Sequence, residues 1–210
     1  MIGLMKNDLM QLLSGIKGGF IVVYLIFIGV MSIFSNVGQL FSYMMIFIFV
    51  MFGIAAFTYE ETYHWDRYVA ALPVSNRQIV LARYGMTGLC MAAGLIAGVI
   101  LWGVSLISGT GDMTSADWML SEVQTLVISV LYIEIMIPVM YRFGAERGRV
   151  VMLLLFIIFF SAVSVLAELG QEWTRWITVY GITMVLMGAA VILLPVSIML
   201  ACGIRAKKEF

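Results

Sequence analysis

The chain has 210 residues, of which 63% are hydrophobic and 11% are charged, and its twelve basic and twelve acidic side chains cancel to zero formal net charge. A soluble domain carries about 25% charged residues. The composition therefore excludes a soluble globular protein and predicts a polytopic membrane protein.

The N-terminal segment is amphipathic. Leu9, Leu12 and Ile16 recur at approximately helical spacing between the charged residues Lys6 and Lys17, which is typical of a helix that lies in the membrane interface. We expect an interfacial helix over 1–17 on the inner leaflet. The apolar run that follows is longer than a signal-peptide core and has no clear cleavage site, so we expect it to be retained as the first span.

Six apolar runs are long enough to cross a membrane. Helices of about 17 to 25 apolar residues can cross a hydrocarbon core about 30 Å thick. The runs cover 18–35, 39–58, 84–107, 120–141, 150–168 and 176–203. We therefore predict an all-α fold with six transmembrane helices in a single domain over 1–210. Cys90 and Cys202 fall inside these runs, which argues against a disulfide framework and against a metal site.

Basic residues gather on one side of the predicted spans. Six spans place both termini on the same side, and all but Arg175 of the twelve Lys and Arg residues then fall on that side. The positive-inside rule makes it the cytoplasmic side. Trp118, Trp173 and Trp176 fall at the opposite ends of the spans, where we expect them to anchor the outer aromatic belt.

The longest polar interruption, residues 59–84, lies on the predicted cytoplasmic side. Its first half, 59–72, predicts a short amphipathic helix, because Trp65 and Leu72 are two turns apart and share one face. Pro73 then ends this helix, since the residue before a proline is disfavoured in helical geometry.

A second helix is predicted to begin directly after this break. Ser75 and Gln78 have the spacing of a capping box, and Val74 and Ile79 occupy the positions of a hydrophobic staple. This helix would run without interruption into the third span. A force applied at the 72–77 corner would then reach two spans through rigid connections, although a capped hairpin that merely joins the spans fits the same residues.

Two stretches resemble the small permease subunits of ABC-2 type ATP-binding-cassette exporters. The first is Leu72-Pro73-Val74-Ser75-Asn76-Arg77-Gln78-Ile79-Val80, with Asn76 where the family more often has a base. The second, at the end of the fourth span, is Ile137-Pro138-Val139-Met140-Tyr141-Arg142-Phe143-Gly144. Length, span count and cytoplasmic termini also resemble the family. Within the family, the chain resembles exporters of amphipathic cytolytic or antimicrobial peptides, for example those that export phenol-soluble modulins.

This resemblance implies a partner ATPase subunit that binds ATP and Mg²⁺, a second permease copy in a homodimer or heterodimer, and no cofactor bound by this chain. It also implies a place in the lipid of a bacterial cytoplasmic membrane. The polar loop would contain a coupling helix that docks on the ATPase through Glu60, Glu61, Trp65, Asp66, Arg67, Leu72, Pro73, Ser75, Arg77 and Gln78. The basic loop over 141–149 would be a topological anchor or an auxiliary contact.

No enzymatic motif occurs in the chain. It lacks the G-x-x-x-x-G-K-[ST] phosphate loop, the H-E-x-x-H zinc motif and the G-x-S-x-G elbow, and its only histidine, His64, lies in the polar loop. We therefore expect no catalytic residue, no metal site and no nucleic-acid partner. A membrane scaffold or sensor that recruits a soluble partner through 59–84 is the alternative to a transporter subunit, and a passive channel is a third interpretation.

Glu134 is the one ionisable residue deep within a predicted span. A carboxylate at that depth costs about 3 kcal/mol to insert, so it should face the bundle interior or water, or be protonated. Pro138 lacks the N–H that would bond the Glu134 carbonyl, which predicts a freed acceptor and a kink. The pair could form a polar patch or hinge in a translocation path, or Glu134 could bond a Tyr, Ser or Thr of a neighbouring span and fix the packing.

Gly94 and Gly98 have G-x-x-x-G spacing in the predicted third span. Small residues at this spacing let two helix backbones approach closely. The approaching helix would be another span of the same chain or a span of a second permease copy.

Overall fold

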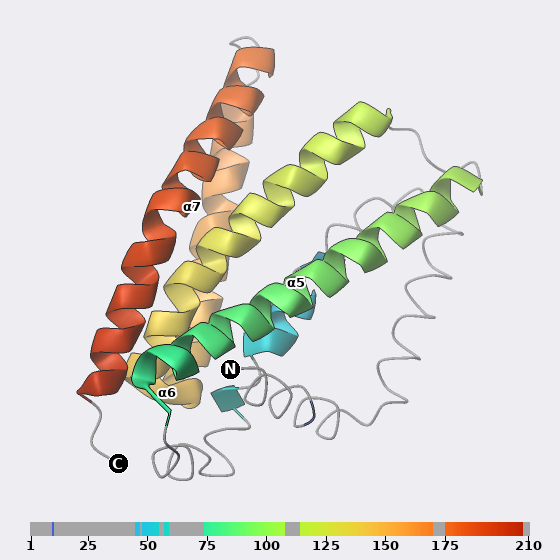
Figure 1. The fold of residues 1–210 in the computed structure, drawn as a ribbon. Helices are drawn as coiled ribbons and strands as arrows, with labels where there is room; N and C mark the ends of the chain where they lie inside the picture. The colour runs from blue at the N-terminus through green and yellow to red at the C-terminus, as the bar shows by residue number, and fades with distance from the viewer. Residues whose placement is uncertain are drawn as a thin grey trace. The chain divides into compact units, whose positions relative to one another are not determined.

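In the computed structural model, three long helices make up most of the described chain (Figure 1). They are α5 (Asn76–Ile107), α6 (Ser115–Leu169) and α7 (Arg175–Ala206). The chain packs as two compact units whose boundary, between residues 129 and 130, lies inside α6. The structure describes residue 10 and residues 45–46, 48–54, 57–58, 74–107, 114–169 and 175–207. Within these residues every regular element is α-helical, which confirms the all-α class for this part of the chain.

Three of the predicted spans lie in the described helices. Asn76–Ile107, Ser115–Gly144 and Thr183–Ala206 are each long and apolar enough to cross a membrane, and they correspond to the predicted third, fourth and sixth spans. The chain is therefore an integral membrane protein. The predicted interfacial helix over 1–17, apart from Met10, and the first span over 18–35 lie outside the described residues, so the count of six spans stays a prediction.

Helix α5 begins at the predicted capping box. The Gln78 amide N–H donates to the Ser75 hydroxyl over 3.3 Å, and the Ser75 amide N–H donates to the Gln78 side-chain carbonyl over 3.2 Å. These bonds satisfy N–H groups that the start of a helix leaves without partners. The capping box is therefore confirmed, and the predicted second helix of the loop and the third span form one continuous helix of 32 residues.

Helical residues between 45 and 58 pack against α5 through two glycines. We name residues 45–46, 48–54 and 57–58 the 45–58 segment; it belongs to the predicted second span. A Cβ atom on Gly53 would lie 2.9 Å from Cγ2 of Thr87, and one on Gly94 would lie 2.9 Å from Cα of Ile46. Because the two contacts follow opposite directions along the two sequences, the segment and α5 are antiparallel.

Stacked indole rings join the end of α5 to the start of α6. The ring centroids of Trp102 and Trp118 lie 4.3 Å apart, and the ring planes are inclined by 13°. Trp118 is buried, so it does not act as the outer belt anchor that the sequence predicts. It instead joins two helices, because stacking covers one face of each large ring. Next to it, the Thr114 hydroxyl donates to the Asp117 carboxylate over 2.8 Å and orders the start of α6.

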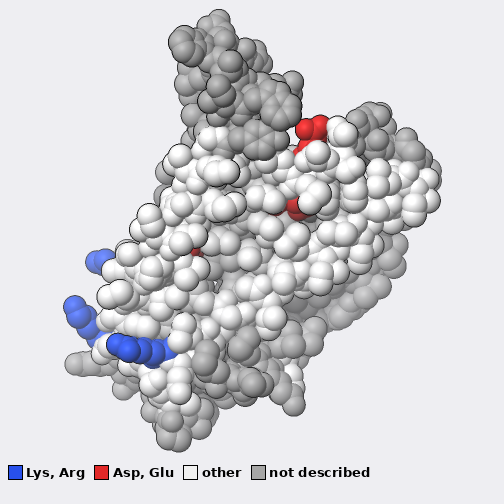
Figure 2. All heavy atoms as spheres, turned by 45° about the horizontal axis from the view of Figure 1, so that its top comes forward, with Lys and Arg blue, Asp and Glu red and all other residues white. Residues whose placement is uncertain are grey.

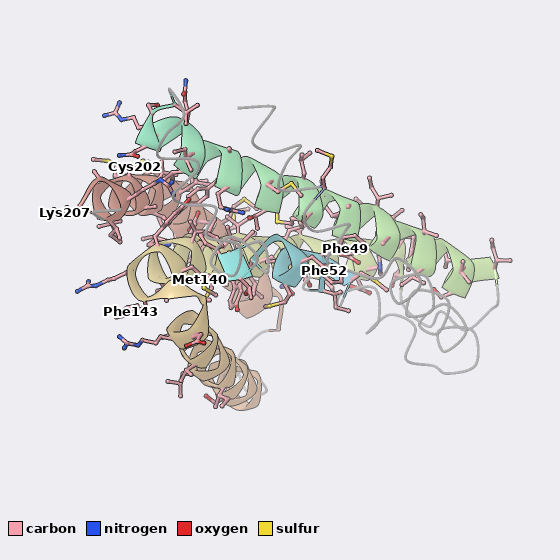
Figure 3. All side chains as sticks on the ribbon, turned by 90° about the horizontal axis from the view of Figure 1, so that it is seen from below. Phe49, Phe52, Met140, Phe143, Cys202 and Lys207 are labelled. Carbon is pink, nitrogen blue, oxygen red and sulfur yellow. The ribbon has the colours of Figure 1, made fainter. Side chains whose placement is uncertain are left out.

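Helix α6 has one break, at Gly144, where φ is 77° and ψ is 175°. A left-handed φ is readily adopted by glycine because glycine has no Cβ. Figure 3 shows the ribbon changing direction just after Met140 and Phe143. The loop conformation predicted over 141–149 is therefore wrong. The predicted fourth and fifth spans both lie in α6 and meet at Gly144, because helical geometry continues on both sides of it.

The first part of α6 runs parallel to α7. Ser197 of α7 contacts Glu134 of α6, and Arg205 of α7 contacts Tyr141 of α6. Both contacts advance in the same direction along the two sequences. Two successive parallel helices require the chain to return between them, and the second part of α6, over 145–169, lies in that interval of sequence. This direction agrees with the predicted order of the fourth, fifth and sixth spans.

We predict that Gly94→Ala lowers the free energy of unfolding by about 1 to 3 kcal/mol, because the new methyl group would force the backbone at Ile46 to shift. The control is Gly88→Ala on the same helix, where an added Cβ has no atom within 4 Å. This control should leave stability unchanged or raise it by up to about 1 kcal/mol through helix propensity. Denaturant titration of both variants in lipid nanodiscs measures the difference, and equal effects would contradict the close approach.

Candidate functional site

The start of α5 presents a polar corner at the end of a membrane span. Ser75, Asn76, Arg77 and Gln78 are all exposed, whereas Ile79 is buried. The capping bonds fix this turn, and no break separates it from the rest of α5. The corner can therefore bind a partner through its polar side chains and pass a displacement along the helix.

Two turns further along α5, Arg83 is buried, with 3% of the residue exposed. Its guanidinium carbon lies 4.6 Å from the ring centroid of Phe57, a buried residue of the 45–58 segment. A cation over an aromatic face is attracted by the ring quadrupole, and more strongly where water is excluded. In the sequence, Arg83 is one of the basic residues that mark the predicted cytoplasmic side. The signal for its burial is its place in the periodic buried stripe that also contains Ile79 and Met86.

The carbonyl group that Pro138 frees has a partner on another helix. Pro138 lies inside α6 and lacks the N–H that would bond the carbonyl of Glu134. The hydroxyl of Ser197 on α7 donates to that carbonyl oxygen instead, and both Ser197 and Glu134 are buried. The freed acceptor that the sequence predicts is thus satisfied by a serine more than sixty residues away, a pairing that no local pattern identifies.

The carboxyl group of Glu134 takes no part in this bond. Only 4% of the residue is exposed, and neither carboxyl oxygen has a hydrogen-bond partner among the residues that the structure describes. The interhelical bond at this position therefore uses the backbone. Among the described residues, the carboxyl group therefore does not join α6 to α7 by a hydrogen bond.

Helix α7 has a proline and a buried cation of its own. Pro195 lies inside the helix two residues before Ser197, and Arg205 is 2% exposed, with its guanidinium carbon 5.7 Å from the ring centroid of Tyr141. Figure 2 shows how sparse charged side chains are on one face of the described residues. Pro195 and Arg205 were not predicted as site residues. For Pro195 the sequence signal is a proline inside the last apolar run.

The predicted site residues that the structure describes fall into three places. Ser75, Arg77 and Gln78 lie together at the corner, Glu134 and Pro138 lie one turn apart on α6, and Gly94 and Gly98 are buried on α5. The other predicted contact residues lie outside the described residues: Glu60, Glu61, Trp65, Asp66, Arg67, Leu72 and Pro73. Among the described residues, no group of three or more His, Cys, Asp or Glu side chains could hold a metal ion.

Residues 3–205 match the family described as ABC-2 family transporter protein. The match covers nearly the whole chain and confirms the resemblance to ABC-2 type permeases. No curated protein and no solved structure matches the chain, so the closer resemblance to exporters of amphipathic peptides stays a prediction.

We predict that Ser197→Ala lowers the free energy of unfolding by about 1 kcal/mol, because it removes an interhelical hydrogen bond inside the membrane. In a Pro138→Ala background the same substitution should cost less, because residue 138 then supplies its own N–H to the Glu134 carbonyl. A double-mutant cycle in lipid nanodiscs measures this coupling. Additive effects would show that Ser197 does not replace the bond that Pro138 lacks.

Proposed function

The chain belongs to the ABC-2 transporter family, and we propose that it is the permease subunit of an ATP-driven exporter in the bacterial cytoplasmic membrane. Members of this family are membrane components of transporters that work with an ATP-binding-cassette ATPase. The chain has no phosphate-binding loop, so we assign ATP and Mg²⁺ to that separate subunit. A second permease copy, identical or related, completes the complex, and both termini lie in the cytoplasm.

The observation that supports this role most directly is the exposed, capped corner at the start of α5. Its side chains face solvent, its turn is fixed by two hydrogen bonds, and it continues into α5 without a break. A partner that displaces the corner therefore displaces a whole span. The preceding residues 59–72 would form the rest of the coupling surface that docks on the ATPase.

Motion of α5 would reach the opposite end of the membrane. A helix of this length spans about 48 Å at the α-helical rise, and at its far end Trp102 stacks on Trp118 of α6. ATP-driven closure of the two ATPases would thus shift α5 and, through the indole pair, α6. The path for the substrate would open between the two permease copies.

Resemblance supports amphipathic cytolytic or antimicrobial peptides as the substrate class. Glu134 and Pro138 would contribute a polar point and a hinge to the translocation path, because α6 carries both in the middle of an apolar span. A buried carboxyl group without a fixed partner among the described residues suits a group that is contacted only during transport.

We predict that the complex purified from native membranes contains an ATP-binding-cassette subunit. Arg77→Glu should weaken this association about tenfold, because reversing an exposed charge at a docking corner replaces attraction with repulsion. Lys207→Glu, a reversal at an exposed residue of the C-terminal end, is the control and should not. If no such ATPase co-purifies, the chain is a scaffold or sensor rather than a permease, and export from liposomes that contain only this chain, without ATP, would indicate a channel.

We predict that Glu134→Gln preserves folding and lowers export about tenfold. Glutamine keeps the carbonyl that Ser197 bonds, so packing is retained, while the charge and the titratable group are lost. Expression, thermal stability and peptide export are measured on the same preparation. Unchanged export at unchanged expression would exclude Glu134 from the translocation path.

A further inference from the structure

We infer that Arg83 is a positioning residue. Its contact with Phe57, which we call the clamp, holds the 45–58 segment and α5 together at the ends nearest to the capped corner, so that both helices move as one rigid unit. This inference rests on the proposed coupling function. It deepens that function, because it names the contact that turns a push on the corner into the movement of two spans.

Three contacts join the two helices in one register. Phe57 meets Arg83, Gly53 meets Thr87 and Ile46 meets Gly94. From the first contact to the second, the residue number falls by four along the 45–58 segment and rises by four along α5. From the second contact to the third, it changes by seven on each helix. Because these steps are equal on both helices and match one and two helical turns, the contacts lie along one straight seam. The helices are therefore joined over about three turns rather than at a single crossing.

The inner two contacts of this seam are steric. At Gly53 and Gly94 the helix backbones approach so closely that an added Cβ would lie 2.9 to 3.0 Å from atoms of the other helix, including backbone atoms at Met45, Ile46 and Thr87. Close packing of this kind resists compression and sliding, and its van der Waals attraction holds the two backbones together where they touch, between Gly53 and Gly94. The attraction at the end of the seam must come from another contact.

Arg83 supplies that attraction at the position where it matters for coupling. Of the three contacts, that of Phe57 with Arg83 lies nearest to the capped corner at Ser75. Both residues are buried, which strengthens a cation–π contact relative to an exposed one. The Thr87 hydroxyl also donates to the Arg83 carbonyl over 3.0 Å, which ties the clamp to the next contact of the seam.

Without the clamp, a push on the corner would spread the two helices instead of moving them. The seam beyond Gly53 would remain, but the first turns of α5 would bend away from the 45–58 segment. ATP hydrolysis would then continue with less export. This outcome differs from a general loss of stability, which would lower complex assembly and hydrolysis together.

The first experiment does not depend on an ATPase partner. Hydrogen–deuterium exchange is measured on the full chain in lipid nanodiscs, for the wild type, Arg83→Gln and Phe57→Leu. Both variants should exchange the backbone amides of residues 79–87 about tenfold faster, the factor by which a buried cation–π contact favours the closed state. Phe52→Leu is the control, because Phe52 contacts Phe49 of its own segment, edge to face at 6.0 Å; Figure 3 labels both rings. Unchanged exchange in both variants overturns the clamp.

The second experiment measures the number of peptides exported per ATP hydrolysed by the purified complex. Arg83→Gln and Phe57→Leu should each lower this ratio about tenfold, with assembly and hydrolysis retained, and the double variant should lower it no further, because the two residues act through one contact. Phe57→Tyr keeps the ring and should preserve the ratio. Should Arg83→Gln fail to fold, the comparison of Phe57→Leu with Phe57→Tyr decides the question alone.

The outcomes separate this inference from the proposed function. Absence of an ATPase from native complexes would reject the permease role, and the exchange experiment would still decide whether the clamp exists. A wild-type ratio in Phe57→Leu, or a double variant that is worse than either single one, would reject the clamp as a coupling contact while leaving the permease role intact.

Discussion

The hydrocarbon core of a membrane contains no water that could bond a backbone N–H or C=O. Each of these groups within a span must therefore find its hydrogen-bond partner in the protein itself. Helices meet this requirement everywhere except where a proline removes an N–H. In α6 that happens at Pro138, and Ser197 of α7 donates to the carbonyl that is left. The pairing of α6 with α7 is therefore supported by backbone chemistry as well as by packing, through the hydroxyl donor at position 197.

The same medium explains how the other helix pairs are joined. Lipid tails are as apolar as leucine, so burial of apolar side chains gives little net attraction between spans. The described pairs instead use close backbone approach at Gly53 and Gly94, stacked indoles at Trp102 and Trp118, and a buried cation over an aromatic ring at Arg83. The order of the contacts along the two sequences gives the direction of two of these pairs: the 45–58 segment and α5 are antiparallel, and the first part of α6 and α7 are parallel. The resulting antiparallel and parallel pairs are consistent with the side that the basic residues predict for the termini.

Local chemistry was predictable from the sequence, and long-range pairing was not. The capping box at Ser75 and Gln78 and the lengths of the described spans follow from patterns within a few turns of helix. The break at Gly144 was missed because the charged residues around it are typical of a loop. A tight corner with helix on both sides accommodates the same charged residues. Ser197 was missed because its partner is distant in sequence. Arg83 was missed because the positive-inside rule assigns a side of the membrane and says nothing of burial.

The interhelical bond at Glu134 also changes how that residue must be explained. Burying a carboxyl group in a span costs about 3 kcal/mol, and a packing bond through its side chain would offset that cost. The observed bond uses the backbone carbonyl, which any residue at this position would supply equally well. The packing of α6 against α7 therefore gives no reason for a glutamate here. Any requirement for a glutamate must therefore lie in an interaction of the carboxyl group itself, which the proposed polar point beside Pro138 in a translocation path would provide.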